Sequence, residues 1–509
     1  MAPGLTDRRA ARPAGFAGSR HPSGMQSASP TADHDGLWSP KRRVLSGGLV
    51  LTITLVAFEA LAVSTVLPIV ARELGGQELY GWVFSAFFLG SLIGIAVVGG
   101  TVDRGALGRP FALGLTLFGI GLLVGGLAPS MEILVAARFI QGLGAGTIPP
   151  IAYVAIGRSL PESLRPRMFA TLSTAWILPG VIGPALAGLV GETLGWRYVF
   201  LGMLPFIAVA GVLTHHAIAA VRVPETTAED ELRAGNAGRR RLPSALLVSL
   251  GAGLFMAGLS SGEPVLLLVL VVAGLLAGIP ALLRLTPPGT LTARPVLPAA
   301  VMLRGILTCT FFGVDAYVTL ALEDGRGLSA IAAGIVLTAA TLSWTAGSWT
   351  QARNSERWPT RRFVRVGFLV VIVGLALFSL TLIPEVPVWL AVPTFAVAGY
   401  GMGLAYAPLA LIVLREAPTE SQGTASSALS LMDTLGTAVG TGVSGAIVAA
   451  ALRSSGDLEM GLAVAFVVSI LVGVGGFAIS GRLRRVRVGG PTGDPVPTRS
   501  GPSAPPAPG

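Results

Sequence analysis

Residues 45–70 read LSGGLVLTITLVAFEALAVSTVLPIV, an almost unbroken apolar stretch that contains a single carboxylate, Glu59. As a helix, this stretch is long enough to cross the roughly 30 Å hydrocarbon core of a bilayer. Glu59 then lies near mid-membrane, where an ionised carboxylate is disfavoured by at least ~2.5 kcal/mol. We therefore expect Glu59 to face a water-filled cavity, to pair with a cation or to hold a proton, as transport sites do.

The composition of the whole chain is that of an integral membrane protein. Of its 509 residues, 52% are hydrophobic and only 12% are charged, about half the charged share of a soluble domain. The net charge of +10 does not indicate a nucleic-acid partner, because the arginines lie mainly in short loops between apolar segments. We expect a lipid bilayer around the chain and no nucleic acid bound to it.

The apolar segments number fourteen and follow a six, two, six arrangement. They are residues 45–70, 81–101, 110–129, 131–157, 168–190, 198–219, 243–260, 264–284, 300–322, 328–350, 361–383, 387–415, 424–452 and 459–481. The basic residues lie mostly in alternate loops, which predicts a plasma-membrane protein with both termini in the cytoplasm.

This pattern predicts seven parts of the chain. They are a disordered cytoplasmic tail (1–43), a six-helix bundle (44–220), a cytoplasmic linker (221–242), two extra transmembrane helices (243–285), a second cytoplasmic linker (286–299), a second six-helix bundle (300–482) and a disordered cytoplasmic tail (483–509). The segment 243–260 is near the minimum length for a span.

The two bundles carry an internal repeat. Asp315 follows Glu59 by 256 residues, and the glycine run from Gly142 to Gly146 recurs 257 residues later, from Gly399 to Gly403. Repeats with the same topology are related by an axis along the membrane normal, with the substrate site between them near the midplane. The sequence therefore predicts an all-α fold of two pseudo-symmetric six-helix bundles plus two linking helices.

Several motifs resemble those of the major facilitator superfamily and, within it, the fourteen-span drug:proton antiporters. Glu59 precedes Leu67-Pro68 at the spacing at which that family carries an aspartate. Arg138, Gln141, Gly142 and Gly144 match the family pattern R-x-x-Q-G-x-G.

Two further motifs resemble the family less closely. The loop after the second span resembles G-x-x-x-D-R-x-G-R but is two residues longer. The fifth span resembles the antiporter motif but has Pro179 and Ala187 where glycine is usual. The matching residues are Gly99, Asp103, Arg104, Gly108 and Arg109 in the loop motif, and Gly180, Gly183, Pro184 and Gly188 in the span.

The resemblance implies a conformational role for these last two motifs. Asp103 is expected to contact helix ends and charges of the opposite bundle and so to stabilise one state of a rocking cycle. Gly183-Pro184 interrupts the helical hydrogen-bond ladder, so the fifth span is expected to bend or to pack closely there. A solvated charged turn is the alternative interpretation of the loop.

Four charged residues within the spans are candidates for proton coupling or substrate binding. Glu59 is the expected proton carrier, and the alternative is a neutral glutamate hydrogen-bonded to a neighbouring helix. Arg138 is expected either to modulate Glu59, through water in preference to a tight ion pair because the two side chains lean in opposite directions, or to bind helix-end carbonyls. Asp315 is supported by the repeat as a second carboxylate. Asp433 has no counterpart in the first bundle, and its role stays open.

The expected substrate pocket is apolar and aromatic, with few acids, which suits lipophilic cations. Most aromatic residues of membrane helices simply pack, so each of these is a candidate contact and no more. Besides Glu59, Asp315 and Asp433, the candidate substrate contacts are Phe87, Phe88, Gln141, Trp176, Trp344, Tyr400 and Tyr406. We expect neither a metal site nor an ATP-binding loop.

Together these features predict a monomeric secondary transporter, not an enzyme, that has no cofactor and is driven by the proton gradient. The expected activity is efflux of amphipathic or lipophilic small molecules, cationic ones among them, such as drugs, by alternating access. Two alternatives stay open. One is a narrow-specificity exporter of one metabolite, antibiotic or lipid, or a proton-coupled importer, and the other is a non-transporting membrane sensor or scaffold.

Overall fold

The computed structural model describes residues 36–76, 79–103, 106–219, 221 and 228–483, and every helix named below belongs to the compact unit that begins at Leu37. This described part of the chain is helical and contains no strand. Fourteen of its helical segments are long and apolar enough to cross a membrane, as the sequence predicts. The predicted tails, residues 1–43 and 483–509, lie largely outside the described residues.

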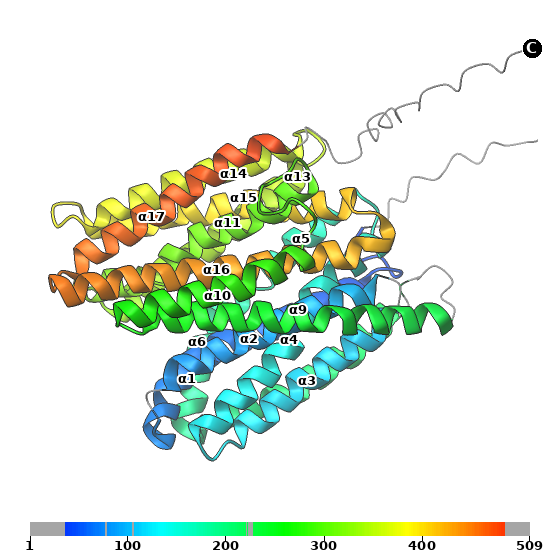
Figure 1. Cartoon of the computed structure of the whole chain (residues 1–509), viewed down its shortest axis with the longest axis horizontal. Helices are drawn as coiled ribbons and strands as arrows, with labels where there is room; N and C mark the ends of the chain where they lie inside the picture. Colours follow the sequence, from blue (N-terminus) through cyan, green and yellow to red (C-terminus); the bar gives the residue numbers. More distant parts are fainter. Residues whose placement is uncertain (1–35, 77–78, 104–105, 220, 222–227, 484–509) are drawn as a thin grey trace, which may run out of the picture. The chain divides into compact units, whose positions relative to one another are not determined.

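The helices form a first set, a connecting pair and a second set (Figure 1). The first set is α1 (Arg43–Leu74), α2 (Tyr80–Val102), α3 (Gly108–Gly126), α4 (Met131–Ser159), α5 (Arg165–Thr174), α6 (Ile177–Val190), the π-helical turn η2 (Gly191–Gly195), α7 (Arg197–Leu201) and α8 (Met203–Ala219). The pair is α9 (Ala228–Ser260) and α10 (Pro264–Leu285).

The second set begins at Leu297 and has the same sequence of spans. It consists of α11 (Leu297–Asp315), α12 (Val318–Glu323), α13 (Ala330–Asn354), α14 (Thr360–Ser379), α15 (Ala391–Glu416), α16 (Gln422–Ser454) and α17 (Leu458–Ile479), with 3-10 turns η3 (Leu380–Leu382), η4 (Val388–Leu390), η5 (Thr419–Ser421) and η6 (Ser480–Arg482).

Helix packing repeats between the two sets. In the first, α4 packs on α2 and α3, and α1 packs on α6 and α8; in the second, α15 packs on α13 and α14, and α11 packs on α16 and α17. The repeated glycines explain the closest of these contacts. A Cβ on Gly142 would strike the Phe87 carbonyl oxygen of α2, and a Cβ on Gly399 would strike the Ala340 carbonyl oxygen of α13. Small residues let membrane helices approach this closely.

The structure corrects one expected boundary and decides between two expected outcomes for the fifth span. Helix α9 begins at Ala228, so its N-terminal part lies within the predicted linker 221–242, and the predicted short span becomes comfortably long. Helix α6 passes Pro184 without ending, and the fifth span is interrupted earlier, between α5 and α6. Gly183 is buried and faces α1 at Phe58, so of the two predicted outcomes, bending or close packing, the structure has packing at this position.

We call the end of the bundle at which α2 ends and α16 begins the inner end; it is the predicted cytoplasmic side. Hydrogen bonds between the two sets are found in this inner half. Ser427 of α16 donates to the Ile95 carbonyl of α2, Ser173 of α5 donates to Ser348 of α13, and Trp349 of α13 donates to Thr174 of α5. The two sets are therefore closed against each other at the inner end.

Candidate functional site

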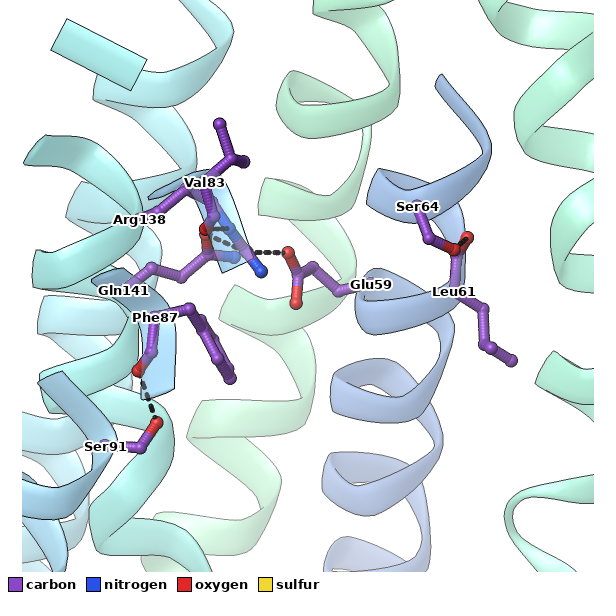
Figure 2. Close-up of polar contacts among 8 residues, drawn as sticks. All are labelled: Glu59, Leu61, Ser64, Val83, Phe87, Ser91, Arg138 and Gln141. Carbon is purple, nitrogen blue, oxygen red and sulfur yellow. Dashed lines mark hydrogen bonds and ion pairs between the residues drawn. The ribbon is translucent and has the colours of Figure 1, made fainter. Parts of the chain in front are cut away.

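Glu59 and Arg138 form a buried ion pair in the first set (Figure 2). Nη1 of Arg138, on α4, lies 2.5 Å from Oε1 of Glu59, on α1. The exposed fractions of the two side chains are only 3% and 1%. A charge that is removed from water needs a counter-ion and hydrogen bonds, and here each residue supplies the other's counter-ion.

Neutral groups complete the surroundings of the arginine. Nη1 also donates to Oε1 of Gln141 at 2.7 Å, and Nε donates to the Val83 carbonyl of α2 at 3.3 Å. The guanidinium lies over the Phe87 ring, 4.4 Å from its centre, in a favourable cation–π arrangement. Arg138 therefore keeps two hydrogen-bond acceptors and an aromatic face that do not depend on the charge of Glu59.

The carboxylate is less completely bonded than the arginine. Oε2 of Glu59 is buried and accepts no hydrogen bond from the described residues, and Nε2 of Gln141 is likewise without a partner. Buried polar atoms are normally paired, so an unpaired one needs an explanation. In this pair Oε2 is the oxygen that is free to take a proton.

The structure corrects the prediction that Arg138 acts on Glu59 through water. The opposite lean of the two side chains is a property of the Cα–Cβ bonds, and an arginine side chain is long enough to compensate for it. Arg138 binds Glu59 directly and also donates to the Val83 carbonyl, in the first turn of α2. That Arg138 modulates the charge of Glu59 stays a prediction. Ser91 helps to hold α2 at this distance from α4, since its hydroxyl donates to the carbonyls of Phe87 and Gly142.

The structure does not bring Asp315 into this network. Asp315 is the last residue of α11, where the ninth span is interrupted before α12. A carboxylate at this position lies at the negative end of the helix dipole, and among the described residues it has no hydrogen-bonding or ionic partner. Its role as a second proton site stays a prediction.

Asp433 belongs to a second cluster, in the inner half of the second set. Oδ2 of Asp433 accepts a hydrogen bond from the Tyr406 hydroxyl at 2.9 Å, and Oδ1 lies 3.7 Å from Nη1 of Arg304. The Arg304 guanidinium covers the Tyr406 ring at 3.4 Å. The sequence interpretation missed Arg304 as a site residue, although it is an arginine within a predicted span, the same signal that identified Arg138.

The predicted aromatic contacts separate into exposed and packed residues. Phe88 and Trp176 are exposed in the described chain. Trp344 packs against Phe311 and Tyr406, and the Tyr400 hydroxyl donates to Thr350. Contact of any of them with a substrate stays a prediction.

Asp103 makes the predicted contact with a helix end of the other set. It follows α2 directly, and its carboxylate accepts hydrogen bonds from the backbone N–H of Thr424 at 3.0 Å and from the Thr424 hydroxyl at 2.5 Å. Thr424 lies in the first turn of α16, where backbone N–H groups lack helical partners. Burial raises the pKa of the Asp103 carboxyl above its ordinary value, and the bonds from Thr424 oppose that shift.

An unexpected arginine from the connecting helices joins this contact. Arg241, on α9, donates through Nη1 to the Thr424 hydroxyl at 2.9 Å and through Nη2 to the Leu285 carbonyl at 3.0 Å. Helix α9 packs on α2 and α16, so it touches both sets (Figure 1). The connecting pair therefore does more than link the two sets, since it contributes a charge to the contact that closes the inner end.

The structure describes only some of the remaining residues of the loop motif. Arg104 lies outside the described residues. Gly108 is buried at the start of α3, beside Arg109. Arg158, at the end of α4, donates to the Val102 and Asp103 carbonyls and so fixes the end of α2. That these contacts bias a conformational cycle stays a prediction.

We expect Arg241→Ala to loosen the inner end. Loss of its hydrogen bond to Thr424 removes about 0.5–1.5 kcal/mol, roughly a two- to tenfold change in an equilibrium. The measurement is the maleimide labelling rate of Ser348→Cys, a buried position between α13 and α5, in a Cys309→Ala background. Arg240→Ala is the matched control, because Arg240 is an exposed arginine of the same helix. Equal labelling rates in the two variants would contradict this role of Arg241.

No metal centre is found in the described part of the chain, where no three His, Cys, Asp or Glu side chains are grouped closely enough to hold an ion. The charged sites described above are instead the Glu59–Arg138 pair, the Arg304–Asp433 pair and the contact of Asp103 with α16.

Comparison with known proteins bears on both family and fold. Residues 49–441 match the family model described as Major Facilitator Superfamily. A probable multidrug-efflux transporter of Mycobacterium tuberculosis (strain ATCC 25618 / H37Rv) is 30% identical, over 85% of this chain and 92% of that protein. The drug efflux pump JefA of the same strain is 28% identical, over 82% of each chain.

Solved structures show the same arrangement of helices. The human organic anion transporter MFSD10 superposes with a TM-score of 0.65 at 16% identity, covering 87% of this chain and 99% of that one. The proton:xylose symporter XylE superposes with a TM-score of 0.61 at 13% identity, covering 85% of this chain and 94% of that one. At these identities the likeness concerns the fold alone, and it confirms the predicted fold class.

Proposed function

Because the chain belongs to the major facilitator superfamily of transporters, we propose that it is a proton-coupled exporter of amphipathic or lipophilic small molecules, cationic ones among them, that works by alternating access. The observation that carries this proposal is the buried pair of Glu59 and Arg138, in which Oε2 of Glu59 has no partner among the described residues. The names of the two mycobacterial relatives support efflux as the direction of transport.

The surroundings of the pair suit a carboxylate that changes its charge during a cycle. When Glu59 takes a proton, Arg138 loses its counter-ion but keeps the Gln141 and Val83 oxygens and the Phe87 ring. A guanidinium cannot lose its proton in a protein, so Arg138 stays charged when Glu59 is protonated. These neutral partners lower the free-energy cost of that state. The arrangement therefore permits proton uptake without leaving a buried charge unsolvated.

A cationic substrate competes with the proton for the same carboxylate. A cation near Glu59 favours its ionised form and so releases the proton, which is the requirement for antiport. One charge that moves down ~150 mV releases about 3.5 kcal/mol, enough for roughly a several-hundred-fold substrate gradient. No further cofactor is needed, and we propose a monomer in the plasma membrane with both termini in the cytoplasm.

The test uses purified protein in liposomes with an acidic lumen and a lumenal pH-sensitive dye. Addition of ethidium outside should raise the lumenal pH through wild type and through Glu459→Gln, and should leave it unchanged through Glu59→Gln. Glu459 is the matched control, because it is an exposed glutamate in the first turn of α17.

The other outcomes are equally informative. Proton release through Glu59→Gln as well would keep antiport but assign the proton to another group, with Asp315 next. If no amphipathic cation triggers release through wild type, the proposed substrate class is wrong, and an exporter of a single dedicated substrate becomes the better interpretation.

A further inference from the structure

The cluster around Arg304 differs from the pair at Glu59 in one respect that matters for ligand binding. Arg138 donates hydrogen bonds through Nε and Nη1, whereas no nitrogen of Arg304 makes a hydrogen bond of good geometry to the described residues, although the Tyr153 hydroxyl lies near enough to interact with the guanidinium. The exposed fraction of the Arg304 side chain is only 1%. A guanidinium carries five N–H donors in a planar fork, and buried donors are normally paired.

The nearest acidic group is too far away to satisfy these donors. Oδ1 of Asp433 lies 3.7 Å from Nη1 of Arg304, and Oδ1 itself accepts no hydrogen bond from the described residues. Asp433 uses its other oxygen to accept from Tyr406, whose ring lies against the guanidinium. Asp433 thus balances the charge of Arg304 without accepting a hydrogen bond from it, and the Tyr153 hydroxyl of the first set is the group that lies against the fork.

We propose that Arg304 is a docking point for an oxyanion of the substrate, such as a carboxylate. This inference rests on the proposed function and extends it, because it makes zwitterionic and anionic amphiphiles substrates beside cations. The planar fork of arginine matches the two oxygens of a carboxylate. An aromatic face beside the fork, that of Tyr406, suits the apolar part of such a molecule.

The position of the cluster fits a site that opens during transport. Arg304, Tyr406 and Asp433 lie on α11, α15 and α16 of the second set, and Tyr153, on α4 of the first set, interacts with Arg304 and Tyr406. Rocking of one set against the other would move Tyr153 away from the cluster. Asp433 has an exposed fraction of 29%, but its Oδ1, which faces Arg304, is buried, so a ligand reaches Arg304 only once the two sets have moved apart.

Asp433 then acts as a competitor of the substrate oxyanion. With no substrate bound it neutralises Arg304; with a carboxylate on Arg304 the two negative groups share one cation, and their repulsion weakens binding. Removal of the Asp433 charge should therefore strengthen binding of an anionic group, whereas removal of the Arg304 charge should abolish its advantage. These opposite signs distinguish a docking point from a merely structural ion pair.

The experiment compares two dyes that differ in one group, a rhodamine with a free benzoate and its methyl ester. Binding to the full-length purified protein in detergent is measured by fluorescence polarisation, without any proton gradient. Arg304→Gln should weaken binding of the free acid about ten- to hundredfold and change binding of the ester less than about threefold. Arg304→Lys keeps the charge but not the fork and should give an intermediate loss for the acid.

Asp433→Asn should tighten binding of the free acid about three- to tenfold and leave the ester nearly unchanged or weaker. Retained binding of the ester is also the control for folding of each variant. Equal effects of Arg304→Gln on both dyes, or none on either, would overturn the proposal, as would wild type that binds only the ester. If neither dye binds wild type, the proposed substrate class fails together with this inference. Proton release through Glu59→Gln in the liposome test would overturn the role of Glu59 alone and would leave the difference between the two dyes in place.

Discussion

Replacement of Glu59 by leucine should lower the free energy of unfolding by about 3–5 kcal/mol, because it removes both the counter-ion and a hydrogen-bond acceptor of the buried Arg138 guanidinium, whereas a proton on Oε2 leaves the acceptor in place. Arg138→Met should cost less, since a stranded carboxyl can take up a proton whereas a stranded guanidinium cannot lose one. The double variant Glu59→Leu/Arg138→Met should recover most of the loss, because paired removal of buried charges is often neutral. Tryptophan fluorescence during unfolding in mixed detergent micelles measures all three.

This double-mutant cycle of Glu59 and Arg138 has one outcome that would contradict the prediction. If the losses of the two single variants simply add in the double variant, the two side chains are not energetically coupled, and the 2.5 Å contact has no energetic role. The double variant also separates stability from transport. It should be nearly as stable as wild type and yet release no protons when ethidium is added, because its stable core lacks the group that carries the proton.

Substitution of Gly142 by alanine should lower the free energy of unfolding by about 1–3 kcal/mol, the usual cost of overpacking a tight contact. The added Cβ would strike the Phe87 backbone carbonyl, which cannot turn away as a flexible side chain would. Helix α2 would have to move away from α4 and would take the Val83 carbonyl with it, away from Arg138. We therefore expect proton-coupled transport to fall together with stability.

Gly334→Ala, in α13, is the matched control for this substitution. An added Cβ on Gly334 meets nothing within 4 Å, and alanine is favoured over glycine in a helix by up to ~1 kcal/mol. The control should therefore be neutral or slightly stabilised in the same unfolding measurement. If both variants were equally stable, the close approach of α2 and α4 would not depend on Gly142.

The spans and the repeat were predictable from the sequence because both depend on the residue types within a short stretch of the chain. A run of apolar residues such as 45–70 crosses a bilayer wherever its neighbours lie, and the glycines from Gly142 to Gly146 and from Gly399 to Gly403 mark the same close helix contact in each set. The boundaries were less predictable. Helix α9 extends back to Ala228, through charged residues that a hydropathy pattern assigns to a loop.

The sequence also identified which charges lie within the spans, where an ionisable residue is rare and needs a reason. Glu59, Arg138 and Asp433 were found in this way, and Arg304 carries the same signal. Which of these residues pair with which was not predictable, because side-chain reach and helix rotation decide it and neither is encoded in spacing along the chain. The direct contact of Arg138 with Glu59, in place of one through water, is the clearest example.

Only the tertiary structure identified the residues of these sites that no sequence pattern singles out. Tyr153 is one aromatic among many in the apolar spans, and Arg241 is one of several arginines in a charged stretch. Tyr153 gains its importance from the packing of α4 against α15, and Arg241 gains its own from the hydrogen bond between α9 and α16. The sequence by itself determined the apolar spans and the charges within them, because bilayer solvation acts on each segment separately, whereas the sites arise from contacts between distant segments, which only folding brings together.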